Sequence, residues 1–506
     1  MFLNKKASLI AGLVCGLSFA PVFFTPAIFM LSVLCYQISK ATTRKQAIVF
    51  SYLFGLGFFL STLYWISFAL SVYINEFWWA IPFALFGLPA FLALFIGAQA
   101  TYLWSLRNSA LYHLLFCCSW VFTEWLMSWI FTGLPWSVIG YALCVSDTLI
   151  QSASVFGIFG LSFAAIYVGS SLFSKQMLST RIIVSTLICA ALVTFGYHRL
   201  QTNQTELSEV KIRIVQPSIP QIDKWDSDIF WSNFSHQLSL SQKDGDPDII
   251  LWSEAALTVP YYYKSIYQGL MSVFTHDNQI LIFGGVNDNG EAGDDYKIYS
   301  SMLALSSEGE ILFDYHKSHL VPFGEYMPLA QYLPVKKLTP GILDYTPGNH
   351  EIVHLQKLNL YIQPLICYES IFPEEIRISN SKADVIINIT NDAWYGNSSG
   401  PYQHFEISRM RSIENGLPMI RAGNNGISAI IDPLGRVLQK LDLNQIDILD
   451  GYIPLKLVLP TLYSEWGTVF ILLQVVLVLI LQSIIVLLFS LFYNYKKLLV
   501  ASSNKR

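Results

Sequence analysis

The chain has 506 residues, of which 53% are hydrophobic and only 13% are charged. Soluble domains carry about 25% charged residues, and the mean hydropathy of +0.45 points the same way. The net charge is −4 without long basic runs, which argues against nucleic acid as a partner. These values exclude an ordinary soluble protein and favour a membrane protein that carries a globular part.

Apolar residues are concentrated toward the two ends of the chain. Residues 1–197 and 466–495 are rich in Leu, Phe, Ile, Ala and Trp, whereas residues 198–465 have the composition of a globular domain. We therefore predict a transmembrane domain of about seven spans over 1–197, a globular domain over 198–465, and a closing transmembrane helix with a tail over 466–506.

Eight apolar stretches approach the length of about 20 residues that a membrane-spanning helix needs. In chain order they are 8–21, 22–39, 47–72, 77–100, 109–131, 153–174, 182–197 and 466–493. The first is short and Pro21 separates it from the second, so this pair is also compatible with a tight hairpin. Residues 8–21 have some signal-peptide character, because Lys5 and Lys6 precede the apolar run. The further spans argue against cleavage.

Basic residues in short loops mark the cytoplasmic side of a membrane protein. With about eight spans, the basic residues that flank them all fall on one side: Lys5, Lys6, Lys40, Arg44, Lys45, Arg107, Lys175, Arg181, Lys496, Lys497, Lys505 and Arg506. The opposite loops, 73–76 and 132–152, contain no Lys or Arg. Both termini are therefore predicted to be cytoplasmic, with 198–465 on the other side, which in a bacterium is the periplasm.

The globular region alternates short β-rich runs with helical stretches. Strands are predicted at 210–216, 248–252, 279–286, 300–306, 360–367, 384–390 and 426–432, and helices at 227–242, 262–277, 371–380 and 402–416. Near-continuous apolar strands between helices indicate sheets covered by helices. Turn signals at 308–310 and 433–435 add hairpins, so some pairing is antiparallel.

Polar residues follow several of these strands at the point where each strand ends. Glu254 follows 248–252, Cys367 ends 360–367, Asn391 follows 384–390, and Lys317 follows the strand-like EILFDY. Ligand sites gather at strand ends because the loops there converge over the sheet. A candidate site is therefore expected at this edge.

Glu254, Lys317 and Cys367 together have the chemistry for acyl transfer. Cys367 is the only cysteine between 198 and 465, so it is either a free nucleophile or a buried inert thiol. A thiol is mostly protonated at neutral pH, and Glu254 can accept its proton while Lys317 stabilises an oxyanion. Taken singly, Glu254 is equally compatible with a surface or helix-terminal acid, and Lys317 with a solvated lysine.

No metal or cofactor motif stands out. The nine histidines are scattered without an HExxH pattern or a paired Cys–His cluster, and no glycine-rich phosphate loop is present. His316 and His404 fit packing roles better than ligation. Glu124 lies inside an apolar run, where an acid is often functional, although an interfacial position is equally open. We expect neither a metal nor a cofactor.

The segments around these residues resemble the nitrilase (carbon–nitrogen hydrolase) superfamily. The matching segments are LWSEAA (251–256), YHKSHLVPFGEYMP (315–328), ICYESIFP (366–373), NITNDAWYG (388–396) and QHFEISRMRSIENGLPMIRAGNNGISAI (403–430). With VQPSIPQIDKW (215–225) and the flanking spans, the chain resembles the apolipoprotein N-acyltransferase family within that superfamily. The resemblance implies an α-helical membrane bundle of about eight spans and a nitrilase-like α-β-β-α sandwich.

The resemblance also implies roles for individual residues. Glu254 is the expected general base, Lys317 the oxyanion partner and Cys367 the nucleophile. Supporting or substrate-binding positions are Glu325, which orients the lysine or aids proton transfer, Tyr368 and Glu369 beside the nucleophile, Trp225 near the substrate entrance, and Asn391 near the oxyanion. For Trp225 and Tyr368, simple aromatic packing stays open. Ser253 stands where the family often has Pro, and Ser frees φ and restores an N–H.

The expected reaction has two steps. A phospholipid, chiefly phosphatidylethanolamine, gives its sn-1 acyl chain to Cys367, and the acyl-enzyme then acylates the α-amino group of the diacylglyceryl-cysteine that begins an apolipoprotein. The partners are therefore a phospholipid donor, a diacylglyceryl-apolipoprotein acceptor and membrane lipids, in the cell inner membrane. One alternative is a membrane-anchored amidase that hydrolyses the same thioester. Another is a non-catalytic transporter or lipid-binding protein.

Overall fold

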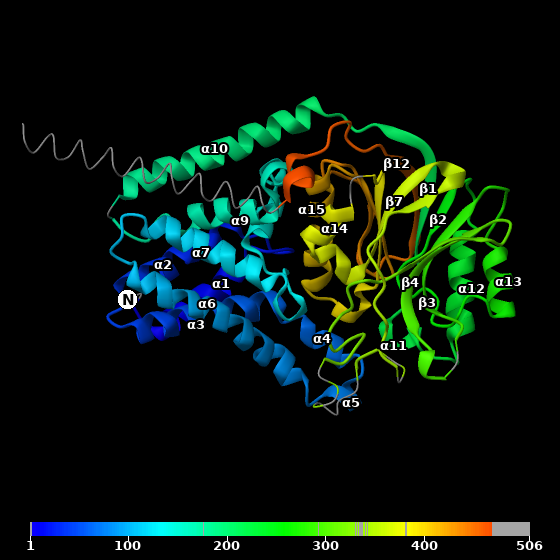
Figure 1. Cartoon of the computed structure of the whole chain (residues 1–506), viewed down its shortest axis with the longest axis horizontal. Helices are drawn as coiled ribbons and strands as arrows, with labels where there is room; N and C mark the ends of the chain where they lie inside the picture. The colour runs from blue at the N-terminus through cyan, green and yellow to red at the C-terminus, as the bar shows by residue number, and fades with distance from the viewer. Residues whose placement is uncertain are drawn as a thin grey trace, which may run out of the picture.

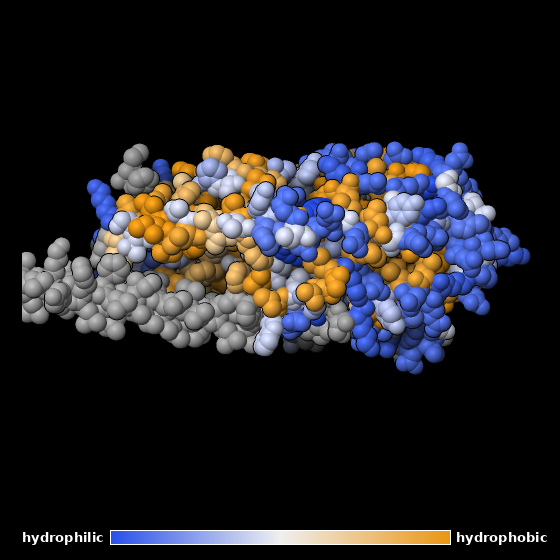
Figure 2. Space-filling view, turned by 90° about the horizontal axis from the view of Figure 1, so that it is seen from above, coloured by the Kyte–Doolittle hydropathy of each residue, from blue (hydrophilic) through white to orange (hydrophobic). Residues whose placement is uncertain are grey.

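The computed structural model describes residues 3–467 apart from 176, 292, 329, 331, 333–336, 340, 342, 380 and 381. Helices from the first part of the chain form an elongated bundle, and the strands lie at the other end of the molecule (Figure 1). The same division marks the surface, where the bundle is largely hydrophobic and the strand-rich end largely hydrophilic (Figure 2). The bundle thus offers an apolar surface that suits lipid, and the strand-rich end a polar one that suits water.

The bundle consists of helices that differ widely in length. They are α1 (Lys5–Gly16), η1 (Thr25–Phe29), α2 (Met30–Lys40), α3 (Arg44–Leu63), α4 (Ile66–Ser71), α5 (Ile74–Phe77), η2 (Phe83–Gly87), α6 (Leu88–Ser105), α7 (Tyr112–Met127), η3 (Ile130–Thr132), η4 (Ile139–Val145), α8 (Asp147–Ile150), α9 (Ala153–Ser170) and α10 (Leu178–Thr202). Within the described residues, four helices are long and apolar enough to cross a membrane: Arg44–Leu63, Phe83–Ser105, Ala153–Ser170 and Leu178–Thr202.

Several predicted spans differ from the helices that form. The stretches 8–21 and 22–39 become α1, with 12 residues, and α2, with 11 residues. At about 1.5 Å per residue these helices are shorter than a bilayer core of about 30 Å. The helix expected over 47–72 ends at Leu63, and α7 has 16 residues where 109–131 was expected. The stretch 466–493 lies almost entirely outside the described residues, so a count of eight spans stays a prediction.

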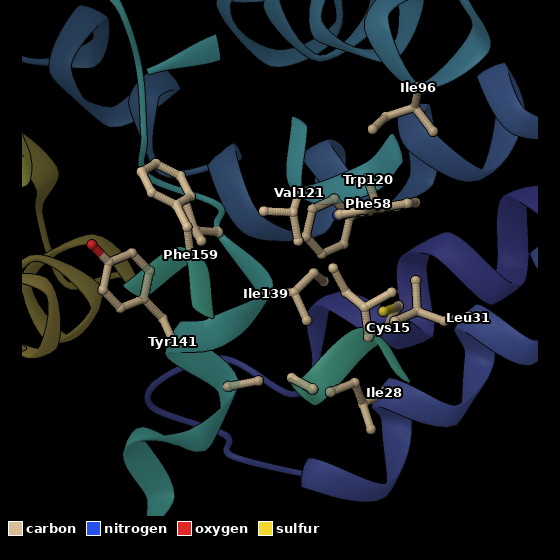
Figure 3. Close-up of a cluster of buried hydrophobic side chains, with 14 of the residues drawn as sticks. Cys15, Ile28, Leu31, Phe58, Ile96, Trp120, Val121, Ile139, Tyr141 and Phe159 are labelled. Carbon is tan, nitrogen blue, oxygen red and sulfur yellow. The ribbon is translucent and has the colours of Figure 1, made fainter. Parts of the chain in front are cut away.

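The bundle core is built from large side chains that several helices direct inward. Cys15, Leu31, Phe58, Trp120 and Ile139 converge in it (Figure 3). Trp120 meets Phe58 edge to face, with ring centroids 6.3 Å apart. Such packing holds the short helices α1 and α2 against the longer ones.

The buried acid Glu124 has structural partners in this core. It is 2% exposed, and its Oε1 accepts hydrogen bonds from Trp120 Nε1 at 3.0 Å and from the main-chain N–H of Ile139 at 2.8 Å. Its Oε2 accepts a hydrogen bond from Ser162. Glu124 therefore joins α7, η4 and α9.

The globular part is a sandwich of two six-stranded sheets. One sheet has the order β12-β1-β2-β3-β4-β5 and the other β11-β10-β9-β8-β7-β6. The strands are β1 (Leu207–Gln216), β2 (Ile249–Leu251), β3 (Ile280–Asp288), β4 (Ile298–Ser306), β5 (Ile311–His316), β6 (Val353–Leu355), β7 (Leu360–Ile366), β8 (Val385–Thr390), β9 (Met419–Gly423), β10 (Ser428–Ile431), β11 (Val437–Leu441) and β12 (Asp447–Pro454).

Helices cover the outer face of each sheet. The first sheet packs against α12 (Phe230–Ser241) and α13 (Lys264–Met271), and the second against α14 (Pro373–Ser379) and α15 (Gly400–Asn415). A separate core of buried Ile, Leu and Val fills the space between the sheets. The predicted α-β-β-α sandwich is therefore confirmed. All seven predicted strands form, whereas β6, β9, β11, β12 and the short α11 (Gln221–Lys224) were not predicted.

The helix α15 seats the sandwich on the bundle. Its residues Ile407, Met410 and Ile413 belong to the same buried cluster as the bundle core. Arg409 Nη1 donates to Asp147 at 2.6 Å, and Glu414 accepts a hydrogen bond from the main-chain N–H of Ile158 at 2.8 Å. Apolar packing thus joins the two parts, and buried polar contacts fix how they meet.

Close packing of α1 on α3 gives the first testable prediction. A Cβ atom at Gly57 would lie 2.2 Å from the main-chain oxygen of Leu9, which cannot move without its helix. We expect Gly57→Ala to lower the free energy of unfolding by about 1–3 kcal/mol, as overpacking does. Thermal unfolding in detergent measures it. Gly97→Ala is the matched control, since its nearest atom, in Tyr52, is 3.5 Å away; equal stability of the two variants would contradict the packing argument.

Candidate active site

Glu254 and Lys317 meet at the strand ends of the first sheet. Glu254 follows β2 and Lys317 follows β5, and Lys317 Nζ lies 3.2 Å from Glu254 Oε1. Lys317 is 1% exposed and Glu254 8%. The other carboxylate oxygen of Glu254 accepts a hydrogen bond of 2.9 Å from the main-chain N–H of Asn391. Both oxygens of Glu254 are therefore fixed, and the carboxylate has a defined direction.

Lys317 lies between two carboxylates. Its Nζ also donates to Glu325 Oε1 at 2.9 Å, while Glu325 Oε2 accepts from the main-chain N–H of Val321 at 2.7 Å. Burial alone lowers the pKa of Lys317, but the charges of Glu254 and Glu325 outweigh burial and raise it well above its usual value. Lys317 thus stays an ammonium at any physiological pH, which suits a partner for a developing oxyanion.

Cys367 comes from the second sheet, directly after β7, and faces this pair. Its backbone has φ of 50°, a left-handed conformation that costs a non-glycine residue about 1–3 kcal/mol and is concentrated at functional sites. Burial raises the pKa of the Cys367 thiol to about 12, Glu254 adds to the rise, and Lys317 opposes it. The thiol therefore keeps its proton at neutral pH, so its reaction requires a base such as Glu254.

Glu369 connects the segment of Cys367 to the segment of Lys317 through hydrogen bonds. Its Oε1 accepts from Tyr315 Oη at 2.9 Å and from the main-chain N–H of Ser318 at 2.7 Å, and its Oε2 accepts from the main-chain N–H of Ile366 at 2.7 Å. Ser318 follows Lys317 and Ile366 precedes Cys367. One fully buried carboxylate thus fixes both segments relative to each other.

The remaining predicted residues lie around this center. Tyr368 donates from its hydroxyl to the main-chain oxygen of Gly133 in the bundle at 2.8 Å. The side-chain amide of Asn391 contacts Gln221 at 2.7 Å and Asn424 at 3.0 Å. The contact of Asn391 with Glu254 is therefore made by its main-chain N–H and not by its side chain. Trp225 is partly exposed at the end of α11.

Sequence comparisons divide the chain at the same place as the structure. The profile of the apolipoprotein N-acyltransferase N-terminal domain matches residues 11–171, and that of carbon-nitrogen hydrolase matches residues 211–462. An apolipoprotein N-acyltransferase from Rickettsia prowazekii is 51% identical over 97% of this chain and 100% of its own. The chain belongs to the apolipoprotein N-acyltransferase family. Membership makes it an acyltransferase.

The chain also matches a more distant relative and several solved structures. The apolipoprotein N-acyltransferase of Brucella melitensis is 38% identical over 79% of this chain and 78% of its own. Among solved structures, a carbon-nitrogen hydrolase from Helicobacter pylori G27 is 16% identical, covers 48% of this chain and 89% of its own, and has a TM-score of 0.37.

A buried polar network behind Cys367 was only partly visible in the sequence. His404 Nε2 lies 3.2 Å from the main-chain oxygen of Cys367, and His404 Nδ1 lies 2.8 Å from Asp392 Oδ1. Arg421 donates to Asp392 Oδ2 at 3.0 Å. Burial opposes the ionisation of Asp392, but Arg421 and His404 outweigh it and hold its pKa below the usual value. The packing role expected for His404 thus includes support of the strained nucleophile.

Aromatic rings from the bundle cover the same side of the site. Trp65 lies 4.4 Å from Trp136 and 4.5 Å from Tyr395, measured between ring centroids. Trp136 stacks on His404 at 5.4 Å. Trp65 and Trp136 belong to the bundle, and Tyr395 and His404 to the sandwich. These residues form an aromatic seam between the two parts, in which Trp65, Trp136 and His404 are buried.

Gly284 of β3 lies so close to the main chain of Glu254 that a larger residue there should displace the base. A Cβ at Gly284 would lie 2.6 Å from the oxygen of Ser253 and 2.7 Å from the Cα of Glu254. Gly284→Ala must push the base away, and a displacement near 1 Å can cost about 100-fold in rate. We expect a fall of that order in acyl transfer.

The neighbouring glycine provides the control. A Cβ at Gly285 makes only ordinary contact, 3.4 Å from Leu257, so Gly285→Ala should keep near-normal activity. Rates and melting temperatures of both variants are compared, because misfolding alone would lower both quantities. Equal rates for Gly284→Ala and Gly285→Ala would show that placement of Glu254 does not depend on this contact.

Proposed function

We propose that the protein transfers an acyl chain from a phospholipid, chiefly the sn-1 chain of phosphatidylethanolamine, through a thioester on Cys367 to the α-amino group of the diacylglyceryl-cysteine of apolipoproteins. The observation that carries the proposal is the buried contact of Glu254 with Lys317 at 3.2 Å beside Cys367, in a chain of this family. Glu254 is the general base, Lys317 the oxyanion partner and Cys367 the nucleophile.

The first step makes the acyl-enzyme. Glu254 accepts the thiol proton while Cys367 Sγ attacks the ester carbonyl carbon, and the carbonyl oxygen becomes an oxyanion beside the Lys317 ammonium. When the intermediate collapses, the bond to the glycerol oxygen breaks. The leaving oxygen takes the proton from Glu254, so a lysophospholipid departs and a thioester remains.

The second step consumes the thioester. The α-amino nitrogen of the acceptor attacks the thioester carbon, and Glu254 takes the proton that the amine loses. Collapse of this second intermediate breaks the C–S bond, and the thiolate recovers the proton from Glu254. The amide product is a triacylated lipoprotein, and Cys367 is a free thiol again.

The division into bundle and sandwich supports this choice of substrates. Drawing a lipid chain out of the bilayer costs about 0.8 kcal/mol per CH₂, and an enzyme held at the membrane avoids that cost. We infer a transmembrane domain over 1–197, a periplasmic catalytic domain over 198–465 and a closing helix and tail over 466–506. In this topology both termini are cytoplasmic and the bundle lies in the inner membrane.

A membrane-anchored amidase is the alternative that the same three residues permit, because only the acceptor differs. Family membership favours transfer over hydrolysis. The aromatic seam formed by Trp65, Trp136, Tyr395 and His404 also limits water near Cys367. A non-catalytic transporter is disfavoured because Glu254, Lys317 and Cys367 lie together and buried.

The proposed function predicts a thioester on Cys367. Purified enzyme incubated with phosphatidylethanolamine should gain the mass of one acyl group, which neutral hydroxylamine removes. Cys367→Ala should show no adduct, while Cys189→Ala, at an exposed cysteine of α10, should match the wild type. Glu254→Gln should slow adduct formation by about 100-fold or more, because it removes the base.

Discharge of the adduct separates the two candidate reactions. Rapid loss on adding a diacylated lipopeptide, with an amide product, supports transfer. Loss in water at the same rate would identify a hydrolase. Absence of any adduct with competent substrates would contradict the assignment of Cys367.

A further inference from the structure

A second buried lysine contacts the proposed base. Lys224 is the last residue of α11 and is 5% exposed, and its Nζ donates a hydrogen bond of 3.1 Å to the main-chain oxygen of Glu254. The proposed reaction assigns it no part. A buried ammonium is costly unless it is paired, so its position beside Glu254 needs an explanation.

The helix α11 holds Glu254 from a second direction as well. Gln221, its first residue, accepts a hydrogen bond from the Asn391 side chain at 2.7 Å, and the main-chain N–H of Asn391 donates to Glu254 Oε2 at 2.9 Å. Lys224 therefore fixes the backbone of Glu254, and Gln221 acts on its carboxylate through Asn391. One short helix therefore positions both the main chain and the carboxylate of Glu254.

No other carboxylate compensates the Lys224 charge among the neighbours that the structure describes there. The small cavity beside Lys224 is lined by uncharged residues: Ile219, Phe230, Asn233, Phe234, Ala256 and Thr258. The charge that acts on Lys224 is that of Glu254. The two groups thus form a buried pair through space, distinct from the contact of Glu254 with Lys317.

We propose that Lys224 is a positioning residue for acyl transfer, a second cation that fixes Glu254 and favours its ionised form. The proposal rests on the function proposed above, in which Glu254 must be unprotonated to accept the thiol proton. The contact that the structure describes for Lys224 Nζ is with Glu254, so in this proposal Lys224 acts through Glu254.

Lys224 is charged at low pH and loses its charge as the pH rises. Burial lowers the pKa of Lys224 to about 7, although Glu254 opposes the fall. The ammonium is therefore present below about pH 7 and is lost as pH rises above it. The effect of the cation on Glu254, and therefore the loss in a variant without it, is expected to be largest below about pH 7.

Other titratable groups also face Glu254 from the surrounding segments. They are Lys317 after β5, Glu325 in the loop that follows, Tyr345, Cys367 after β7 and Tyr395. Lys317 keeps its charge, and Cys367, Tyr345 and Tyr395 stay protonated, because the pKa values of all four are raised. Glu325 is common to the wild type and a Lys224 variant, so it cancels in their ratio.

The test is the pH profile of thioester formation in the full-length enzyme. Rates of Cys367 adduct formation from phosphatidylethanolamine are measured for wild type, Lys224→Met and Lys224→Arg. We expect Lys224→Met to be slower by about 10-fold or more near pH 6 and by less than about 3-fold near pH 9. Lys224→Arg should restore most of the rate at low pH, because it keeps the cation.

Controls separate this role from a general loss of structure. Lys264→Met, at an exposed lysine of α13, should follow the wild type at every pH, and melting temperatures verify that each variant is folded. Met fills the buried site with apolar atoms, which proteins tolerate well in place of a buried charge.

Each outcome bears on the proposal. A loss that is equal at all pH values would overturn it, since a purely structural lysine behaves in that way. Wild-type rates in Lys224→Met, within about 2-fold across the range, would also overturn it while leaving the thioester mechanism intact. If the wild type forms no Cys367 thioester, the proposed function fails first, and the role of Lys224 fails with it.

Discussion

The ammonium of Lys317 is held between the carboxylates of Glu254 and Glu325, and the arrangement of the rest of the site depends on these two ion pairs. Three buried charges are tolerated only when their geometry is fixed and their remaining hydrogen bonds are made. The main-chain N–H groups of Asn391 and Val321 make those bonds. Segments from both sheets must therefore stay in register, which explains why the strand ends carry so many buried polar contacts.

The burial that strengthens these charges also protects the nucleophile. A thiol whose pKa is raised to about 12 stays protonated at neutral pH, and in the proposed reaction it becomes reactive only when Glu254 takes its proton. Two contacts hold the strained backbone of Cys367. Glu369 accepts a hydrogen bond from the main-chain N–H of the preceding residue, and His404 Nε2 contacts the main-chain oxygen of Cys367. The same dry surroundings lengthen the life of a thioester, because water is the competing acceptor. Transfer to an amine and exclusion of water thus have one structural cause.

The sequence allowed prediction of residues that meet at the candidate site and of the strands that carry them, because apolar runs followed by polar residues have a local signature. Glu254, Lys317 and Cys367 were found in this way. Strands such as β11, whose side chains are largely exposed, lack that signature. Lys224 and Trp136 gain their roles from partners in distant segments, Glu254 and Gln403. The stretches 8–21 and 22–39 were predicted as spans, but the helices α1 and α2 that form there are shorter. Close contacts at Gly12 and Gly57, which join α1 to α3, could not be predicted because they depend on the tertiary fold.

The junction of bundle and sandwich has a consequence for the proposed reaction, in which two lipid substrates use one cysteine. The bundle core includes Tyr368, directly after Cys367, and Ile371 and Phe372, which follow within one short helical turn. Arg409 and Glu414 fix α15 on the bundle, and buried charges of this kind specify orientation more than they add stability. The cysteine is therefore held at a constant place relative to the bundle, from which the lipid donor and acceptor of the proposed reaction would approach. This fixed position fits the proposed ping-pong order, in which one cysteine receives the acyl group from the donor and then passes it to the acceptor.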